Sequence, residues 1–166
     1  MRRPLVIHAG EPPSPVDRRL HRRLPSRLDL KQPVMDEIAS LLIGQGWVAE
    51  DDRPWVYLCL DEALVNAMLH GNEGDPLLEV DIVVHIDESR WIITVADQGH
   101  GFVASSVPDH EQPESLMLEH GRGIRIMQEW LDELLYYRAG RCAWLARRRA
   151  DRDSVAEPVA EPKADT

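Results

Sequence analysis

The chain has 166 residues, of which 29 are acidic and 19 are basic, and its formal net charge is −10. This length favours one domain with flanking tails, and the negative charge argues against direct binding to nucleic acid or to an anionic membrane. The two cysteines, Cys59 and Cys142, lie in apolar contexts and are too few for a disulfide framework or a metal cage. Because no apolar stretch is long enough for a membrane span or a signal peptide, we expect a cytoplasmic protein.

Both ends of the chain differ in composition from the middle. Residues 1–23 hold six arginines against two acidic residues, and four prolines interrupt them. We expect an irregular basic arm there, with Leu5 to Ile7 as a candidate edge strand. Its charges could contact the acidic body or a partner, but solvation is the simpler expectation. Residues 150–166 lack a burial pattern and should form a disordered acidic tail, which leaves residues 24–149 as the domain.

The domain should contain helices and strands in mixed order. The expected elements are a helix over 34–42, a helix over 56–72, strands over 78–86 and 91–96 joined by a hairpin, a helix over 124–131, and strands over 134–137 and 141–146. The first strand alternates apolar and polar residues, which favours an antiparallel or mixed sheet with one buried face. The polar connection over 103–120 is long for a small domain, and such connections are usually functional or mobile.

A polar stripe follows the second of these helices. Glu62, Asn66 and His70 recur every four residues, so at about 100° per residue they lie along one narrow line of an α-helix. Most of their neighbours are apolar, and a buried carboxylate or amide requires a partner. The stripe predicts either a polar ligand or an ordinary helix edge that faces water.

Two glycine motifs lie downstream of the stripe. In Asp97-x-Gly99-x-Gly101, the carboxylate follows a strand and can accept a hydrogen bond from an exocyclic amine, while the glycines allow a flat ring to approach the backbone. In Gly121-Arg122-Gly123, amides at a helix entrance are expected to offer donors to phosphate oxygens, and the arginine adds a charge. Either motif alone is compatible with a plain turn.

One nucleotide would satisfy all three sites together. Asp97 suits the amine of adenine, and the second glycine motif suits the phosphates. Asn66 can supply an oxygen to Mg²⁺ that bridges the phosphates, and Glu62 can hold a water or accept a hydroxyl proton. His70 is as compatible with helix packing as with a ligand contact, and we assign it no catalytic role.

The three segments together resemble the N, G1 and G2 boxes of the GHKL ATPase superfamily. The segments are Glu62-Ala63-x-x-Asn66-Ala67-x-x-His70-Gly71-Asn72, Asp97-x-Gly99-x-Gly101 and Gly121-Arg122-Gly123-Ile124. Their order and spacing are also similar, and the compact form with a short lid over 103–120 is most similar to bacterial anti-sigma-factor serine/threonine kinases.

This resemblance implies an α+β fold, a two-layer sandwich with helices on one face of a mixed, mainly antiparallel sheet. It also implies ATP and Mg²⁺ as cofactors. Glu62 matches the family's catalytic carboxylate, and Asn66 matches its Mg²⁺ ligand. The remaining ATP-binding positions implied by the match are Asp97, Gly99, Gly101, Gly121, Arg122 and Gly123.

The implied reaction is transfer of the γ-phosphoryl group of ATP to a serine of a STAS-type anti-anti-sigma protein. A sigma factor or related regulator is the implied second partner, and the resemblance also suggests a homodimer. The acidic composition of the lid leaves open an alternative, a nucleotide-gated module that binds partners without useful catalysis. A third reading, an interaction protein that binds no nucleotide, requires all three motifs to be coincidental.

Overall fold

A computed structural model of the chain describes residues 3–14, 17–102 and 119–149. The described elements are β1 (Val6–Ile7), β2 (Arg18–Pro25), the 3₁₀ turn η1 (Leu28–Leu30), α1 (Lys31–Gly44), the 3₁₀ turn η2 (Glu50–Asp52), α2 (Arg53–Val65), the π-helical segment η3 (Asn66–Gly71), β3 (Glu79–Ile86), β4 (Arg90–Ala96), α3 (Glu119–Trp130), β5 (Glu133–Tyr137), the 3₁₀ turn η6 (Arg138–Gly140) and β6 (Cys142–Arg148). The expected acidic tail and most of the expected lid lie outside the described residues.

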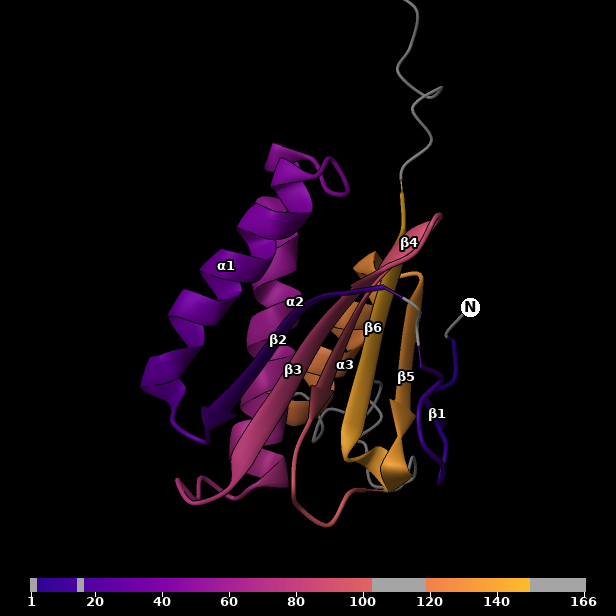
Figure 1. Ribbon diagram of the computed structural model, residues 1–166. Coiled ribbons are helices and arrows are strands. Elements are labelled where there is room, and N and C mark those ends of the chain that lie inside the picture. Colours follow the sequence, from indigo (N-terminus) through magenta and orange to yellow (C-terminus); the bar gives the residue numbers. More distant parts are fainter. Residues whose placement is uncertain (1–2, 15–16, 103–118, 150–166) are drawn as a thin grey trace, which may run out of the picture.

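The strands form a six-stranded sheet in the order β1-β5-β6-β4-β3-β2. β1 pairs with β5 in parallel, and the other neighbours are antiparallel. The helices α1, α2 and α3 cover one face of this sheet (Figure 1). The structure therefore confirms the expected α+β fold with a mixed, mainly antiparallel sheet.

The core lies between the helices and the sheet. Along β3, every second residue is buried, and these residues are Val80, Ile82, Val84 and Ile86. The buried positions of α1 and α2 include Ile38, Leu42, Leu60 and Leu64, all at most 1% exposed. Fully burying an aliphatic side chain of this size contributes about 1.5–3 kcal/mol. The alternation in the sequence therefore identified the face of β3 that drives folding.

The basic arm is more ordered than its composition indicated. The candidate edge strand over Leu5 to Ile7 is confirmed as β1, but the expectation of an irregular segment is wrong for residues 18–23, which belong to β2. Leu20 is buried on the helix side of the sheet, and Arg22 pairs with the carboxylate of Glu37 on α1. The arm thus contacts the acidic body through Arg22 and through Arg23, whose Nε lies 3.4 Å from the carboxylate of Asp81.

The second helix changes its winding after Val65. It was expected to run to residue 72 as one α-helix, but the segment from Asn66 to Gly71 is π-helical. The backbone N–H of Asn72 donates to the carbonyl of Ala67, five residues earlier, at 2.8 Å. A π-turn closes with i→i+5 bonds, so residues four apart no longer lie one above the other. The predicted single stripe is therefore broken between Asn66 and His70.

Asn72, which follows the π-helical segment, is a buried polar residue near the site, and it is 1% exposed. Its amide nitrogen donates to the Ser26 hydroxyl at 2.8 Å and to the Glu79 carbonyl at 3.0 Å. Its amide oxygen accepts from the backbone N–H of Gln98 at 2.8 Å. One side chain thereby ties the end of β2, the start of β3 and the end of β4 to the end of the helix.

We expect Asn72→Ala to lower the free energy of unfolding by about 2–4 kcal/mol, because it leaves several buried donors and acceptors without partners. Urea denaturation measures this change. Gln45→Ala, which removes an exposed amide at the end of α1, is the matched control and should cost less than about 0.5 kcal/mol. Equal stabilities of the two variants would contradict the role assigned to Asn72.

Candidate functional site

The site begins where the end of the helix meets the end of β4. A methyl group at Gly71 would lie 2.4 Å from the carboxylate carbon of Asp97, and one at Gly99 would lie 2.0 Å from the carbonyl oxygen of Gly71. Real side chains do not approach so closely, so both positions require glycine. The first predicted segment and the first glycine motif are thus in direct backbone contact.

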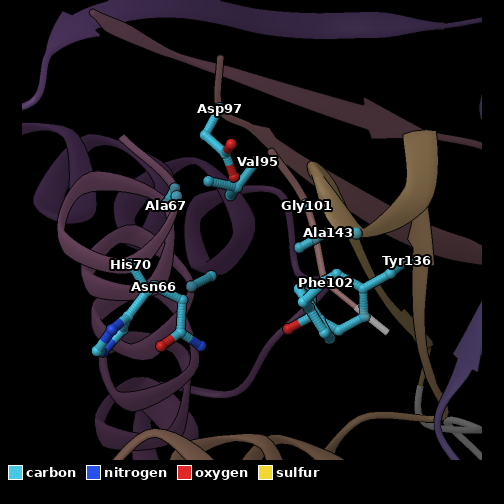
Figure 2. A pocket seen from close by; sticks show the side chains of 12 residues that line it. Asn66, Ala67, His70, Val95, Asp97, Gly101, Phe102, Tyr136 and Ala143 are labelled. Atoms are coloured by element: carbon cyan, nitrogen blue, oxygen red, sulfur yellow. The ribbon is translucent and has the colours of Figure 1, made fainter. Parts of the chain in front are cut away.

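A cavity opens beside this contact, between the helix, β4 and the β5–β6 hairpin (Figure 2). The residues that line it are Ala63, Asn66, Ala67, His70, Gly71, Val95, Asp97, Gly101, Phe102, Tyr136, Gly140 and Ala143. The structure therefore brings Asn66, Asp97 and Gly101 together, as the motifs predicted. Gly99 lies behind Asp97, against Gly71.

Asp97 is the acidic residue that lines this cavity. Its Oδ1 accepts the backbone N–H of Gly99 at 2.8 Å, and no described residue donates to its Oδ2. Burial raises the pKa of the Asp97 carboxyl to about 6, although the Gly99 hydrogen bond and the charge of Arg141 oppose the rise. Burial therefore destabilises the ionised form of Asp97. A ligand that donates a hydrogen bond to this carboxylate would stabilise that form.

Gly101 and Phe102 form the part of the wall that leads away from Asp97. Gly101 has φ +76°, and a methyl group there would lie 2.0 Å from the carbonyl oxygen of Ala139. That carbonyl accepts the backbone N–H of Phe102 at 3.0 Å. The first glycine motif is therefore held between the helix end on one side and the turn η6 on the other.

Asn66 and His70 differ in how they face the cavity. Figure 2 shows the Asn66 amide directed toward the hydroxyl of Tyr136, whereas the ring of His70 is turned away from it. The sequence left helix packing and a ligand contact equally open for His70. The residue is exposed, and the π-helical winding places it off the line of Asn66. Sequence reasoning assigned no role to Tyr136, which appeared only as one aromatic residue of a short strand.

Glu62 is not among the residues that line the cavity. Its side chain packs instead against α3, where a methyl group at Gly123 would lie 1.7 Å from Glu62 Oε2. With the Glu62 side chain in this position, a side chain at residue 123 would displace the carboxylate. The structure joins the first and third predicted segments through this contact.

The second glycine motif lies inside α3 and not before it. We expected Gly121, Arg122 and Gly123 to precede a helix that begins at residue 124, but α3 begins at Glu119. Gly123 lies in the second turn of α3, where the backbone N–H donates a hydrogen bond within the helix. The expectation that Gly123 offers a free amide donor is therefore wrong. Arg122 is exposed and does not line the cavity.

Two further observations limit the chemistry of the described residues. In residues 3–14, 17–102 and 119–149, no three His, Cys, Asp or Glu side chains are clustered in a way that could hold a metal ion. Within the same ranges, no helix is long and apolar enough to cross a membrane. A metal at this site would depend on few protein ligands, of which the Asn66 amide oxygen is the candidate.

The sequence over residues 24–147 matches the family of histidine kinase-like ATPase domains, and the chain belongs to that family. The chain is 31% identical to an anti-sigma F factor of Halalkalibacterium halodurans over 88 residues, which are 51% of this chain and 59% of that protein. It is also 31% identical to an anti-sigma F factor of Anoxybacillus flavithermus over 91 residues, 52% of this chain and 61% of that protein. The chain thus spans about three-fifths of the length of these curated relatives. The resemblance inferred from the three motifs is confirmed.

The raised pKa of Asp97 predicts a pH-dependent cost to stability. Between about pH 4 and 6, the folded chain keeps a proton that the unfolded chain has released, so this group lowers the free energy of unfolding as the pH rises. Asp97→Asn keeps an acceptor for Gly99 and should raise the free energy of unfolding by on the order of 2 kcal/mol at pH 7.

Urea denaturation of both proteins at about pH 4 and pH 7 measures this effect. The gain should fall below about 1 kcal/mol at the lower pH, where the carboxyl is protonated in the folded chain and about half protonated in the unfolded chain. A gain that is the same at both pH values, or a loss at pH 7, would contradict the assigned strain.

Proposed function

We propose that the cavity binds Mg-ATP and that the chain is an anti-sigma-factor-like serine/threonine kinase. The observation that carries the proposal is the convergence of Asn66 and Asp97, from separate predicted motifs, on one cavity. Membership of the histidine kinase-like ATPase family supports the choice of nucleotide. The substrate and partners below rest on the similarity to anti-sigma F factors.

Asp97 suits the base of the nucleotide. Its Oδ2 receives no hydrogen bond from a described residue, and adenine presents an exocyclic amine that can donate to it. An accepted hydrogen bond from the ligand also favours the ionised carboxyl, so ATP should lower the pKa of Asp97. The apolar walls from Ala67 and Val95 are compatible with a flat ring beside this carboxylate.

Asn66 suits the phosphate end. An amide oxygen is a hard ligand of the kind that Mg²⁺ accepts, and Mg²⁺ in nucleotide sites uses few protein ligands besides phosphate oxygens and water. The absence of a larger acidic cluster among the described residues fits such a site. When bound, Mg²⁺ would neutralise the charge of the phosphates during transfer.

Glu62 is the proposed catalytic residue. It precedes Asn66 by four residues, one turn earlier on the helix, and it lies against Gly123 of α3. A carboxylate there can accept the proton of a serine hydroxyl as its oxygen attacks the γ-phosphorus, which yields phosphoserine and ADP. The proposed acceptor is a STAS-type anti-anti-sigma protein, and the proposed binding partner is a sigma factor, with the chain acting as a homodimer.

One observation favours a second candidate function. Glu62 does not line the cavity, and its carboxylate packs against the backbone of α3. A carboxylate held there would serve the position of α3 instead of proton transfer. The chain would then be a nucleotide-gated module that exchanges partners without efficient phosphoryl transfer.

Replacement of Glu62 by Gln separates the two candidates. The variant retains the size and hydrogen-bonding capacity of the side chain but cannot accept a proton at neutral pH. Incubated with radiolabelled Mg-ATP and a STAS-type protein, it should lose at least about 100-fold in serine labelling, since a general base contributes roughly 10²–10⁴-fold. Its affinity for ATP should stay within about twofold of the wild type.

Glu129→Gln, at an exposed position of α3, is the matched control and should label like the wild type. Labelling by Glu62→Gln at the wild-type rate would remove Glu62 from catalysis. If the wild type binds ATP but labels no partner, while bound partners change between ATP and ADP, the nucleotide-gated module is the correct function.

A further inference from the structure

The turn η6, between β5 and β6, borders the cavity and has an unfavourable backbone conformation. Arg138 and Ala139 have φ +52° and +55°, in the left-handed region that residues other than glycine rarely adopt. Gly140 lines the cavity, and the Ala139 carbonyl accepts the backbone N–H of Phe102 at 3.0 Å. Two consecutive residues in this region need contacts from elsewhere in the chain to hold them there.

Those contacts come from residues 3–11 of the N-terminal arm, which include β1 and lie along β5 (Figure 1). The His8 carbonyl accepts the backbone N–H of Ala139 at 2.9 Å, and the Gly10 carbonyl accepts that of Arg138 at 2.8 Å. Both left-handed residues are therefore hydrogen-bonded to the arm.

Two side chains of the arm strengthen this attachment. The ring of His8 stacks on Tyr137 with centroids 4.9 Å apart, and its backbone N–H donates to the Tyr136 carbonyl at 2.8 Å. The carboxylate of Glu11 accepts from the Arg138 Nε at 2.7 Å. The arm therefore binds the turn through backbone, ring and charge.

The position of the turn determines the shape of the cavity wall. A methyl group at Gly140 would lie 2.6 Å from the backbone nitrogen of Phe102, and one at Gly101 would lie 2.0 Å from the Ala139 carbonyl oxygen. Gly101 belongs to the same motif as Asp97, the residue proposed to bind the base. A shift of the turn would therefore displace the wall at the base end of the cavity.

We propose that His8 and Glu11 are positioning residues for nucleotide binding, which hold η6 in the shape that the cavity requires. The inference rests on the proposed function, because it takes ATP as the ligand. Neither residue lines the cavity, so their effect on the ligand passes through the turn. The arm precedes residues 24–147, which match the ATPase family, so this support for the site comes from outside the matched domain.

His8→Pro tests the role, because proline removes the N–H that donates to the Tyr136 carbonyl and loosens the arm beside the turn. Calorimetry should show the dissociation constant of ATP rising about fivefold to tenfold, since binding must then restore a disfavoured turn. The rise should be the same with Mg²⁺ and with EDTA, because η6 borders the base end. Arg3→Ala is the matched control, since Arg3 donates to the Asp132 carbonyl at the other end of β5, at 2.6 Å. It should change the constant by less than about twofold.

A glycine in the turn adds a readout that a general loss of stability would not give. Ala139→Gly removes the steric cost of the left-handed conformation, so the turn depends less on the arm. In that background, His8→Pro should weaken ATP binding by less than about twofold. Equal weakening in both backgrounds, or weakening only with Mg²⁺, would overturn the inference.

Glu11→Lys decides the question even if His8→Pro impairs folding, because it leaves the arm backbone intact and places two positive charges together. It should weaken ATP binding about threefold, and adding Arg138→Glu should restore the wild-type constant. Unchanged binding by Glu11→Lys, or no restoration by the exchanged pair, would overturn the assignment. Absence of ATP binding to the wild type would instead overturn the proposed function itself.

Discussion

The contact between the carbonyl of Gly71 and the backbone at Gly99 is the constraint on which the site depends. The end of the helix and the segment after β4 approach so closely that a methyl group at Gly99 would lie 2.0 Å from the carbonyl oxygen of Gly71. Asp97 lies between the end of β4 and Gly99, so this contact fixes the backbone on both sides of it, and its side chain lines the cavity. The hydrogen bonds of Asn72 also hold this junction, with partners at or next to the ends of three strands.

The junction combines a stabilising residue with a destabilising one. Asn72 has its donors and acceptor satisfied, whereas Asp97 is a half-buried carboxylate whose pKa burial raises to about 6. Such a carboxylate costs stability in the free protein and gains a partner when a donor binds. The chain belongs to a family of ATPase domains, and a nucleotide that donates a hydrogen bond to Asp97 would offset this cost in stability.

Much of the fold could be predicted from the sequence where burial follows a simple period. The alternation of β3 identified its buried face, and α1 and α2 each begin three residues before the expected start. β2 was missed because the exposed Arg22 interrupts the apolar alternation after Leu20, and its charge pairs with Glu37 of α1, the next helix in the chain. No local pattern could show that pairing before the chain is folded.

The sequence predicted the site residues that belong to a motif. It did not predict the features that depend on contacts between segments distant in the sequence. Asp97, Asn66 and Gly101 meet as their motifs predicted. The change to π-helical winding at Asn66 depends on how the helix end docks on the strands, and the sequence period gave no sign of it. Tyr136 reaches Asn66 only through the pairing of β5 in the sheet, so its place in the wall required the structure.

The central claim is that one ATP occupies the cavity between Asp97 and Asn66. Titration calorimetry of Mg-ATP into the wild type, Asp97→Ala and Asn66→Ala tests it most directly. We predict one ATP per chain for the wild type and at least about tenfold weaker binding for each variant, roughly 1.4 kcal/mol or more. No binding heat with the wild type, or unchanged affinity in both variants, would contradict the claim.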